Sequence, residues 1–151
     1  MKFRSQQLRV VSLLLVIYYL ILAWMFNRTG YEHPERLFYA EKLKLLFEYS
    51  ENTLLTLGTT FPTTSFLINV IFAPFGYLFA PVASSIVLMS FLFFFMAKDI
   101  NGSGLPARTM IISLMALFLL HPQFIFAATS GRNIAAIMLF TYLLFRSLFL
   151  Y

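Results

Sequence analysis

The sequence of 151 residues contains no cysteine, which excludes disulfide bonds, thiolate metal ligands, cysteine nucleophiles and S-palmitoylation. Charged residues are also scarce. They make up 11% of the chain, whereas a soluble globular domain carries about 25%. The two histidines, His33 and His121, lie far apart, and the sequence has no zinc-binding or nucleotide-binding motif. We therefore expect neither a metal site nor a cofactor.

Hydrophobic residues are what the chain has in quantity: they make up 60% of it, and the mean hydropathy is +0.82. A surface so poor in charge would aggregate in water, so lipid is the natural solvent. The net charge of +5 does not indicate a nucleic-acid partner, because the basic residues punctuate apolar runs instead of forming one patch. The sequence predicts an all-α, polytopic transmembrane protein that lies in the lipid bilayer as a single domain over residues 1–151.

Apolar runs of nearly 20 residues predict where the chain crosses a hydrocarbon core of about 30 Å. The first run follows Lys2, Arg4 and Arg9 and ends at the bulky residues 23–26. Because signal-peptide cleavage requires small residues, this run is predicted to be an uncleaved anchor whose N-terminus is cytoplasmic. The four predicted spans are residues 8–26, 81–97, 109–128 and 134–151.

The only long polar stretch lies in the predicted non-cytoplasmic loop, residues 27–60. Pro34 is suited to the first turn of a helix. From there, charged side chains recur on one helical face and apolar side chains on the opposite face. The charged face carries Glu41, Lys44, Glu48 and Glu51, and the apolar face carries Tyr39, Leu43 and Leu46. The pattern predicts an amphipathic helix over residues 34–50 that lies on the membrane surface.

A proline-broken apolar segment, residues 61–80, leaves two topologies open. Pro62, Pro74 and Pro81 interrupt an uncharged stretch, and each proline removes a backbone donor that a lipid-exposed helix needs. In one topology this segment is a re-entrant or interfacial hairpin and the chain has four spans. In the other topology it crosses the membrane and the chain has five.

The distribution of basic residues favours four spans. That topology places Lys98, Arg108 and Arg146 in the cytoplasm with the basic N-terminus and leaves Arg132 outside. Five spans would reverse this arrangement, against the positive-inside rule. Both a bacterial inner membrane and an endoplasmic reticulum membrane fit the predicted topology.

Two acidic residues just beyond the first span are candidate catalytic residues. Glu32 and Glu35 flank His33 and Pro34. Partial desolvation at a lipid–water boundary makes a carboxylate a stronger base, so either residue could serve as a general base. The alternative is that both are solvated residues in the first turn of a surface helix, where acidic side chains favour the helix dipole.

Three further titratable residues lie close to the ends of spans. Arg132, in a polar break, is a candidate ligand for an anionic headgroup or a lipid phosphate, or it only marks the interface. His121 is a second candidate for the same ligand, although an imidazole before Pro122 can also serve as a helix cap. Arg146 is expected to extend its side chain to the membrane surface.

Three stretches carry a resemblance to a known family. An acidic loop at residues 31–40, a proline-led apolar segment at 61–76 and a proline-then-small-residue break at 121–132 follow the first span in that order. This order resembles the N-terminal third of the integral-membrane GT-C glycosyltransferases. The resemblance implies a polyprenyl-phosphate-linked sugar as substrate and Glu32 or Glu35 as the catalytic residue. The loop lacks the aspartate and the adjacent acidic pair typical of that family, and the usual double proline is a single Pro62.

The length of the chain bears on the function that the resemblance implies. Such enzymes are several times longer, so the chain is expected to be either a fragment of a longer glycosyltransferase or a small relative that has lost catalysis. The alternative is a small non-catalytic subunit or assembly factor that packs against larger membrane proteins. A transporter or channel component ranks last, because the predicted spans carry few polar residues.

Overall fold

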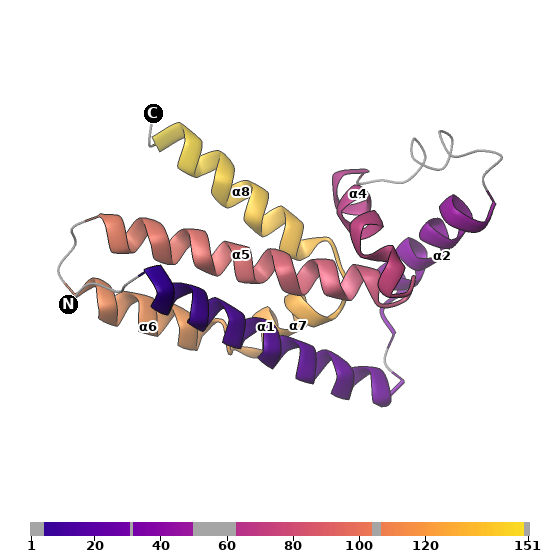
Figure 1. The fold of residues 1–151 in the computed structure, drawn as a ribbon, viewed down its shortest axis with the longest axis horizontal. Helices are drawn as coiled ribbons and strands as arrows, with labels where there is room; N and C mark the ends of the chain where they lie inside the picture. Colours follow the sequence, from indigo (N-terminus) through magenta and orange to yellow (C-terminus); the bar gives the residue numbers. More distant parts are fainter. Residues whose placement is uncertain (1–4, 31, 50–62, 104–106, 150–151) are drawn as a thin grey trace.

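The computed structural model describes residues 5–30, 32–49, 63–103 and 107–149, and every regular element within them is helical. The predicted all-α class is therefore confirmed. Along the chain shown in Figure 1, the elements are α1 (Ser5–Arg28), α2 (Pro34–Glu48), α4 (Thr63–Phe72), the 3-10 helix η2 (Ala73–Phe75), α5 (Ala80–Gly102), α6 (Arg108–Phe118), α7 (Pro122–Thr129) and α8 (Ile134–Phe149).

Two helices, α1 and α5, are long and apolar enough to cross a membrane, and α6 with α7 forms a third crossing if the bent pair counts as one. At about 1.5 Å per residue, α1 and α5 each measure about 35 Å, against a hydrocarbon core of about 30 Å. The described part of the chain thus contains two or three candidate spans. Their length and composition indicate a membrane location.

The predicted single span over residues 109–128 consists instead of two helices, which meet at an angle of 68°. His121 has extended backbone angles, φ −65° and ψ 139°, and is the N-cap of α7. Pro122 explains the break: it disfavours helical angles at the preceding residue and has no N–H to continue the hydrogen-bond ladder of α6. A new helix starts at the proline in a new direction.

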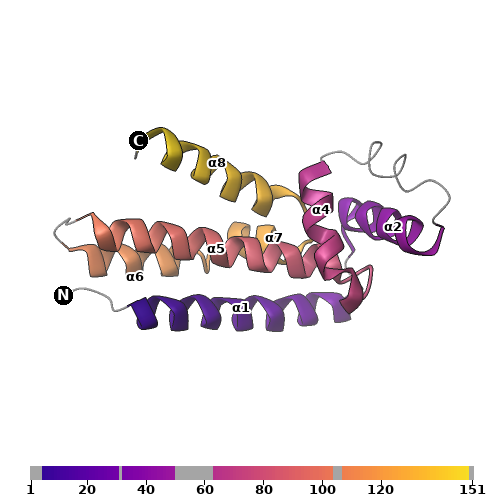
Figure 2. The same ribbon diagram turned by 45° about the horizontal axis from the view of Figure 1, so that its top comes forward.

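Helix α5 is the centre of the fold, since it contacts α1, α2, α4, α6, α7 and α8. Figures 1 and 2 show α1 and α6 running alongside it. The main core gathers around Met89 and Phe93 of α5, both fully buried. On α1, Tyr19 is buried as well, and its hydroxyl donates to the Leu119 carbonyl oxygen at 2.9 Å. This bond satisfies a carbonyl just past the end of α6 that has no intrahelical partner.

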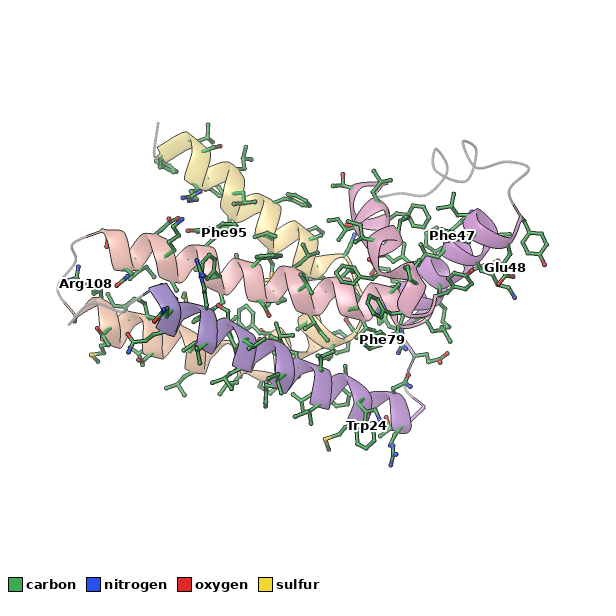
Figure 3. The ribbon with its side chains drawn as sticks, viewed as in Figure 1. Trp24, Phe47, Glu48, Phe79, Phe95 and Arg108 are labelled. Atoms are coloured by element: carbon green, nitrogen blue, oxygen red, sulfur yellow. The ribbon has the colours of Figure 1, made fainter. Side chains whose placement is uncertain are left out.

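The apolar face of α2 packs on protein. Tyr39 and Leu43 are buried in a second, smaller core with Phe66 of α4 and with Ala80. Figure 3 shows Phe47 and Glu48 towards the far end of α2. The predicted charged face is exposed at Glu41, Lys44 and Glu48, while Glu51 lies outside the described residues. The sequence pattern therefore identified the two faces of α2, but α4 and the start of α5 cover its apolar side.

The α-helix within the proline-broken segment is short. Helix α4 has 10 residues, or about 15 Å of helix, which is half the hydrocarbon thickness. It packs on α5, where the single hydroxyl proton of Ser84 is shared between Asn69 Oδ1 and the Pro81 carbonyl oxygen. Pro62 lies outside the described residues.

Candidate functional site

Several elements converge at one end of the bundle, which we call the α2 end. It comprises the end of α1, the first turn of α2, the connection from η2 to α5, and the turn between α7 and α8 (Figure 1). Figure 3 shows Trp24 and Phe79 close to this end, whereas Phe95 and Arg108 lie towards the other. The α2 end contains Glu32, Glu35 and Arg132, three of the four candidate catalytic or phosphate-binding residues that the sequence indicates.

Glu35 is bound through both of its carboxylate oxygens. Oε2 accepts from Arg132 Nε at 3.3 Å, and Oε1 accepts from the backbone N–H of Asn133 at 3.0 Å. These bonds join α2 to the turn before α8, 97 residues later in the sequence. Glu32, by contrast, is exposed. The two predicted catalytic carboxylates therefore have different environments, and the one inside the fold is occupied in holding a turn.

Gly131 allows this turn to approach α2 and α5 closely. Its φ of +71° is in the left-handed region that favours glycine. A Cβ at this position would lie 3.2 Å from Arg36 Cγ, 3.2 Å from Pro81 Cβ and 3.3 Å from Val82 Cγ2. The Ser85 hydroxyl lies 3.0 Å from the Arg132 carbonyl oxygen and 2.9 Å from the Pro81 carbonyl oxygen, and its one proton is shared between the two. Close contact and this hydrogen bond fix the position from which Arg132 reaches Glu35.

Arg36 is a functional candidate that the sequence reasoning missed. Its side chain is 7% exposed; Nε donates to the Leu78 carbonyl oxygen at 2.8 Å and Nη2 to Asn27 Oδ1 at 3.1 Å. Burial lowers the pKa of Arg36, and the negative charge of Glu32 acts in the opposite direction. Its helical spacing offered a signal: Arg36 lies three and seven residues before Tyr39 and Leu43, on the buried face of α2.

A cavity of about 490 Å³ lies between the end of α1, the start of α2 and α7. Ser130, at its wall, is 5% exposed, and its hydroxyl has no hydrogen-bond partner among the residues that the structure describes. The neighbouring Thr129 hydroxyl bonds instead to the Ile125 carbonyl oxygen at 2.7 Å. The residues lining the cavity are Ala23, Phe26, Thr29, His33, Arg36, Phe126, Thr129 and Ser130.

The two predicted phosphate ligands are not brought together. His121 caps the start of α7, where its Nδ1 accepts from the Gln123 N–H at 3.3 Å. Arg132 lies beyond the other end of this helix of 8 residues, which is about 12 Å long. Arg132 lies over the ring of Phe126, with Cζ 5.9 Å from the ring centroid. His121 thus serves as a helix cap, and Arg132 is paired with Glu35.

At the opposite end of the bundle, Arg146 forms an ion pair. Its Nε donates to Asp99 Oδ2 at 2.6 Å and its Nη2 to Asp99 Oδ1 at 3.2 Å. The Tyr142 hydroxyl also donates to Asp99 Oδ2, at 2.6 Å. The expectation that Arg146 simply extends to the membrane surface missed this partner. The sequence did offer a signal for this ion pair, because Asp99 and Arg146 both lie close to the ends of predicted spans.

Comparisons with known proteins add no assignment: no family model matches the sequence, and neither the curated proteins nor the solved structures give a match. Within the described ranges, no group of three or more His, Asp or Glu residues could hold a metal ion. Any function proposed for the α2 end must therefore be argued from the geometry of its residues.

Proposed function

We propose that the chain crosses the membrane four times, through α1, α5, the bent pair α6 and α7, and α8, with its N-terminus in the cytoplasm. The short α4 supports four spans over five, because 10 residues reach only halfway across the hydrocarbon core. In Figure 1 the start of α1, the end of α5, the start of α6 and the end of α8 lie at the same end of the bundle. Lys98, Arg108 and Arg146 would then face the cytoplasm.

The absence of cysteine provides a direct test of this topology. Ser103, exposed after α5, is predicted to be cytoplasmic, and Thr29, exposed after α1, is predicted to be outside. In intact cells, a membrane-impermeant maleimide should label Thr29→Cys but not Ser103→Cys. Ser103→Cys should react once the cells are permeabilised. Labelling of Ser103→Cys in intact cells would contradict four spans with a cytoplasmic N-terminus.

We further propose that the chain acts as a non-catalytic subunit or assembly factor of a larger membrane complex. One observation carries this proposal: both carboxylate oxygens of Glu35 are used to hold the turn before α8. A general base needs an oxygen that can reach a substrate proton. Glu35 acts instead as a structural link, and Glu32 is exposed.

A GT-C-like module is the second candidate, favoured by a different observation. The three segments that carry the resemblance meet at the α2 end. Glu35 and Arg132 join the first to the third, and Tyr39 and Phe66 join the first to the second through rings with centroids 6.5 Å apart. In this proposal the chain handles a polyprenyl-phosphate-linked sugar and is catalytic only together with further spans.

Glutamate variants separate the two proposals. The full chain and its Glu32→Gln and Glu35→Gln variants are expressed in the native membrane and purified in mild detergent, and partners, protein level and sugar transfer are measured. A subunit should co-purify with larger chains at a fixed ratio. Glu35→Gln should then lower its accumulation and Glu32→Gln should leave it unchanged. Loss of sugar transfer at normal accumulation in either variant would favour the GT-C module and overturn the non-catalytic proposal.

A further inference from the structure

The cavity at the α2 end has the size and position of a ligand site. Its volume of about 490 Å³ falls within the range of roughly 300–1,000 Å³ found for small-molecule sites. It lies where α1 ends, and α1 is a candidate span. Phe26 and Phe126 contribute apolar lining, and Arg36 and Ser130 contribute polar groups. A ligand with both an apolar and a polar part would match this lining.

Arg36 gives the cavity a buried positive charge. A buried charge is costly unless a group of opposite charge pairs with it. The neighbouring Glu35 is turned to Arg132, and Arg36 makes no ion pair with any described residue. Glu32 influences Arg36 electrostatically, but it is exposed and lies outside the cavity lining. The guanidinium therefore lacks a counter-ion within the cavity.

Two other polar groups in the lining, Ser130 and His33, can donate hydrogen bonds to a ligand, whereas the Thr29 and Thr129 hydroxyls already donate to backbone carbonyl oxygens. The Ser130 hydroxyl is buried and unpartnered within the described part of the chain. At His33, Nδ1 accepts from the Glu35 N–H at 3.2 Å, so the neutral ring carries its proton on Nε2. Among the residues that the structure describes, none that lines the cavity carries a carboxylate. Cationic and neutral donors without a competing acid are typical of an anion site, and a guanidinium matches phosphate geometry well.

We propose that this cavity binds a phosphate-ester anion through Arg36 and Ser130, carried either by a lipid headgroup or by a small soluble molecule. The site does not depend on whether the chain is a subunit or a glycosyltransferase module. Phe26 and Phe126 would lie beside the apolar part of a lipid. Arg36 would supply the charge, and the phosphate would accept the hydrogen bond that the Ser130 hydroxyl does not make with any described residue.

The test uses the full chain purified in detergent and native mass spectrometry with two lipids that share acyl chains. Dioleoyl phosphatidic acid carries the phosphate, and dioleoylglycerol lacks it. The chain should bind phosphatidic acid at least tenfold more tightly. Ser130→Ala should weaken this binding roughly tenfold, as expected for one hydrogen bond to a charged group. The exposed Ser147 lies at the other end of the bundle, so Ser147→Ala is the matched control and should bind normally.

Variants that change charge extend the test. Arg36→Gln should abolish the preference for phosphatidic acid, whereas Glu32→Gln should strengthen it by removing a nearby negative charge. Thermal unfolding of each variant identifies any loss of binding caused by unfolding, and Ser130→Ala tests the site with a minimal change in packing.

Displacement of the lipid by millimolar inorganic phosphate would identify recognition of the phosphate alone. If the variants weaken binding of phosphatidic acid but inorganic phosphate does not displace it, the cavity recognises a lipid headgroup. Equal binding of the two lipids, or unchanged binding in a folded Ser130→Ala, would overturn the proposal.

Discussion

The two ends of the bundle are each held by an acid and an arginine, but in different ways. At one end, Asp99 of α5 receives two hydrogen bonds from Arg146 of α8 and one from Tyr142. This contact involves two helices that already lie side by side. At the α2 end, Glu35 binds Arg132 and the backbone of Asn133, next to a glycine turn packed against α2 and α5. That contact depends on several segments at once.

This difference indicates where the fold tolerates change. The contact between Asp99 and Arg146 is local, so its loss should cost the energy of that contact and little more. The α2 end contains a close backbone approach at Gly131 and buried polar groups such as Arg36 and Tyr39, each dependent on the others' positions. Substitutions there should have larger effects, and the cavity should be lost with them.

The largest effect is expected for Gly131→Ala. The substitution places a Cβ about 3.2 Å from Arg36 and Pro81 and forces alanine into a left-handed conformation. The conformation costs about 1–2 kcal/mol, and the overpacking adds about 1–3 kcal/mol. The free energy of unfolding, measured by denaturant titration in detergent micelles, should fall by about 3 kcal/mol.

Gly30→Ala is the matched control for this comparison. Gly30 has nearly the same φ, +73°, but among the described residues beyond its chain neighbours no atom lies within 4 Å of a Cβ there. The free energy of unfolding of the control variant should fall only by the cost of the left-handed conformation, about 1 kcal/mol. Equal losses in the two variants would show that close packing at the turn contributes nothing.

An alkaline pH titration should reveal the second-largest effect. Burial, reinforced by the negative charge of Glu35, raises the pKa of Tyr39 to about 12, against about 10 in an unfolded chain. Between pH 10 and pH 12 the unfolded chain has lost this proton and the folded chain still holds it. The stability that depends on Tyr39 is therefore complete below pH 10 and is lost as the pH rises through about 12.

Tyr39→Phe isolates this contribution from those of other tyrosines. The difference in unfolding free energy between the original chain and the variant should change by about 2–3 kcal/mol between pH 9 and pH 12. At pH 7 the variant should be at least as stable, because the buried Tyr39 hydroxyl has no hydrogen-bond partner among the described residues. A pH-independent difference would contradict the raised pKa.

A smaller effect than that at Gly131 is expected for the ion pair at the opposite end of the bundle. Asp99→Asn keeps the shape of the side chain but removes its charge, and both partners of the ion pair are about one-third exposed. Unfolding free energy should fall by about 1–2 kcal/mol. Glu48→Gln, which breaks a more exposed pair with Lys44, should cost under about 0.5 kcal/mol. A loss at Asp99 as large as that at Gly131 would remove the distinction between the two ends.

The sequence predicted those parts of the fold that depend on neighbouring residues. Pro34 and the alternation of charged and apolar faces predict a helix over residues 34–50, and α2 covers Pro34–Glu48. For the span predicted at 81–97, the structure has a longer helix, α5, because Lys98 and Asp99 remain helical. These charges therefore do not mark the end of the helix.

The sequence pattern could not predict contacts between residues that are far apart in the chain. Glu35 was singled out as an acid near the membrane, but its partner Arg132 lies 97 residues away, and no local periodicity connects them. Arg36 was overlooked because an arginine on a surface helix is usually solvated. Its burial follows from the packing of α2 against α4 and α5, which a single helix does not reveal.

The two acid–arginine pairs also bear on how the protein is made. Each acid is synthesised before its arginine: Glu35 by 97 residues and Asp99 by 47. Neither carboxylate can therefore form its ion pair until the later residue has been translated. Arg132 is translated before Arg146, so the partner of Glu35 is available before the partner of Asp99.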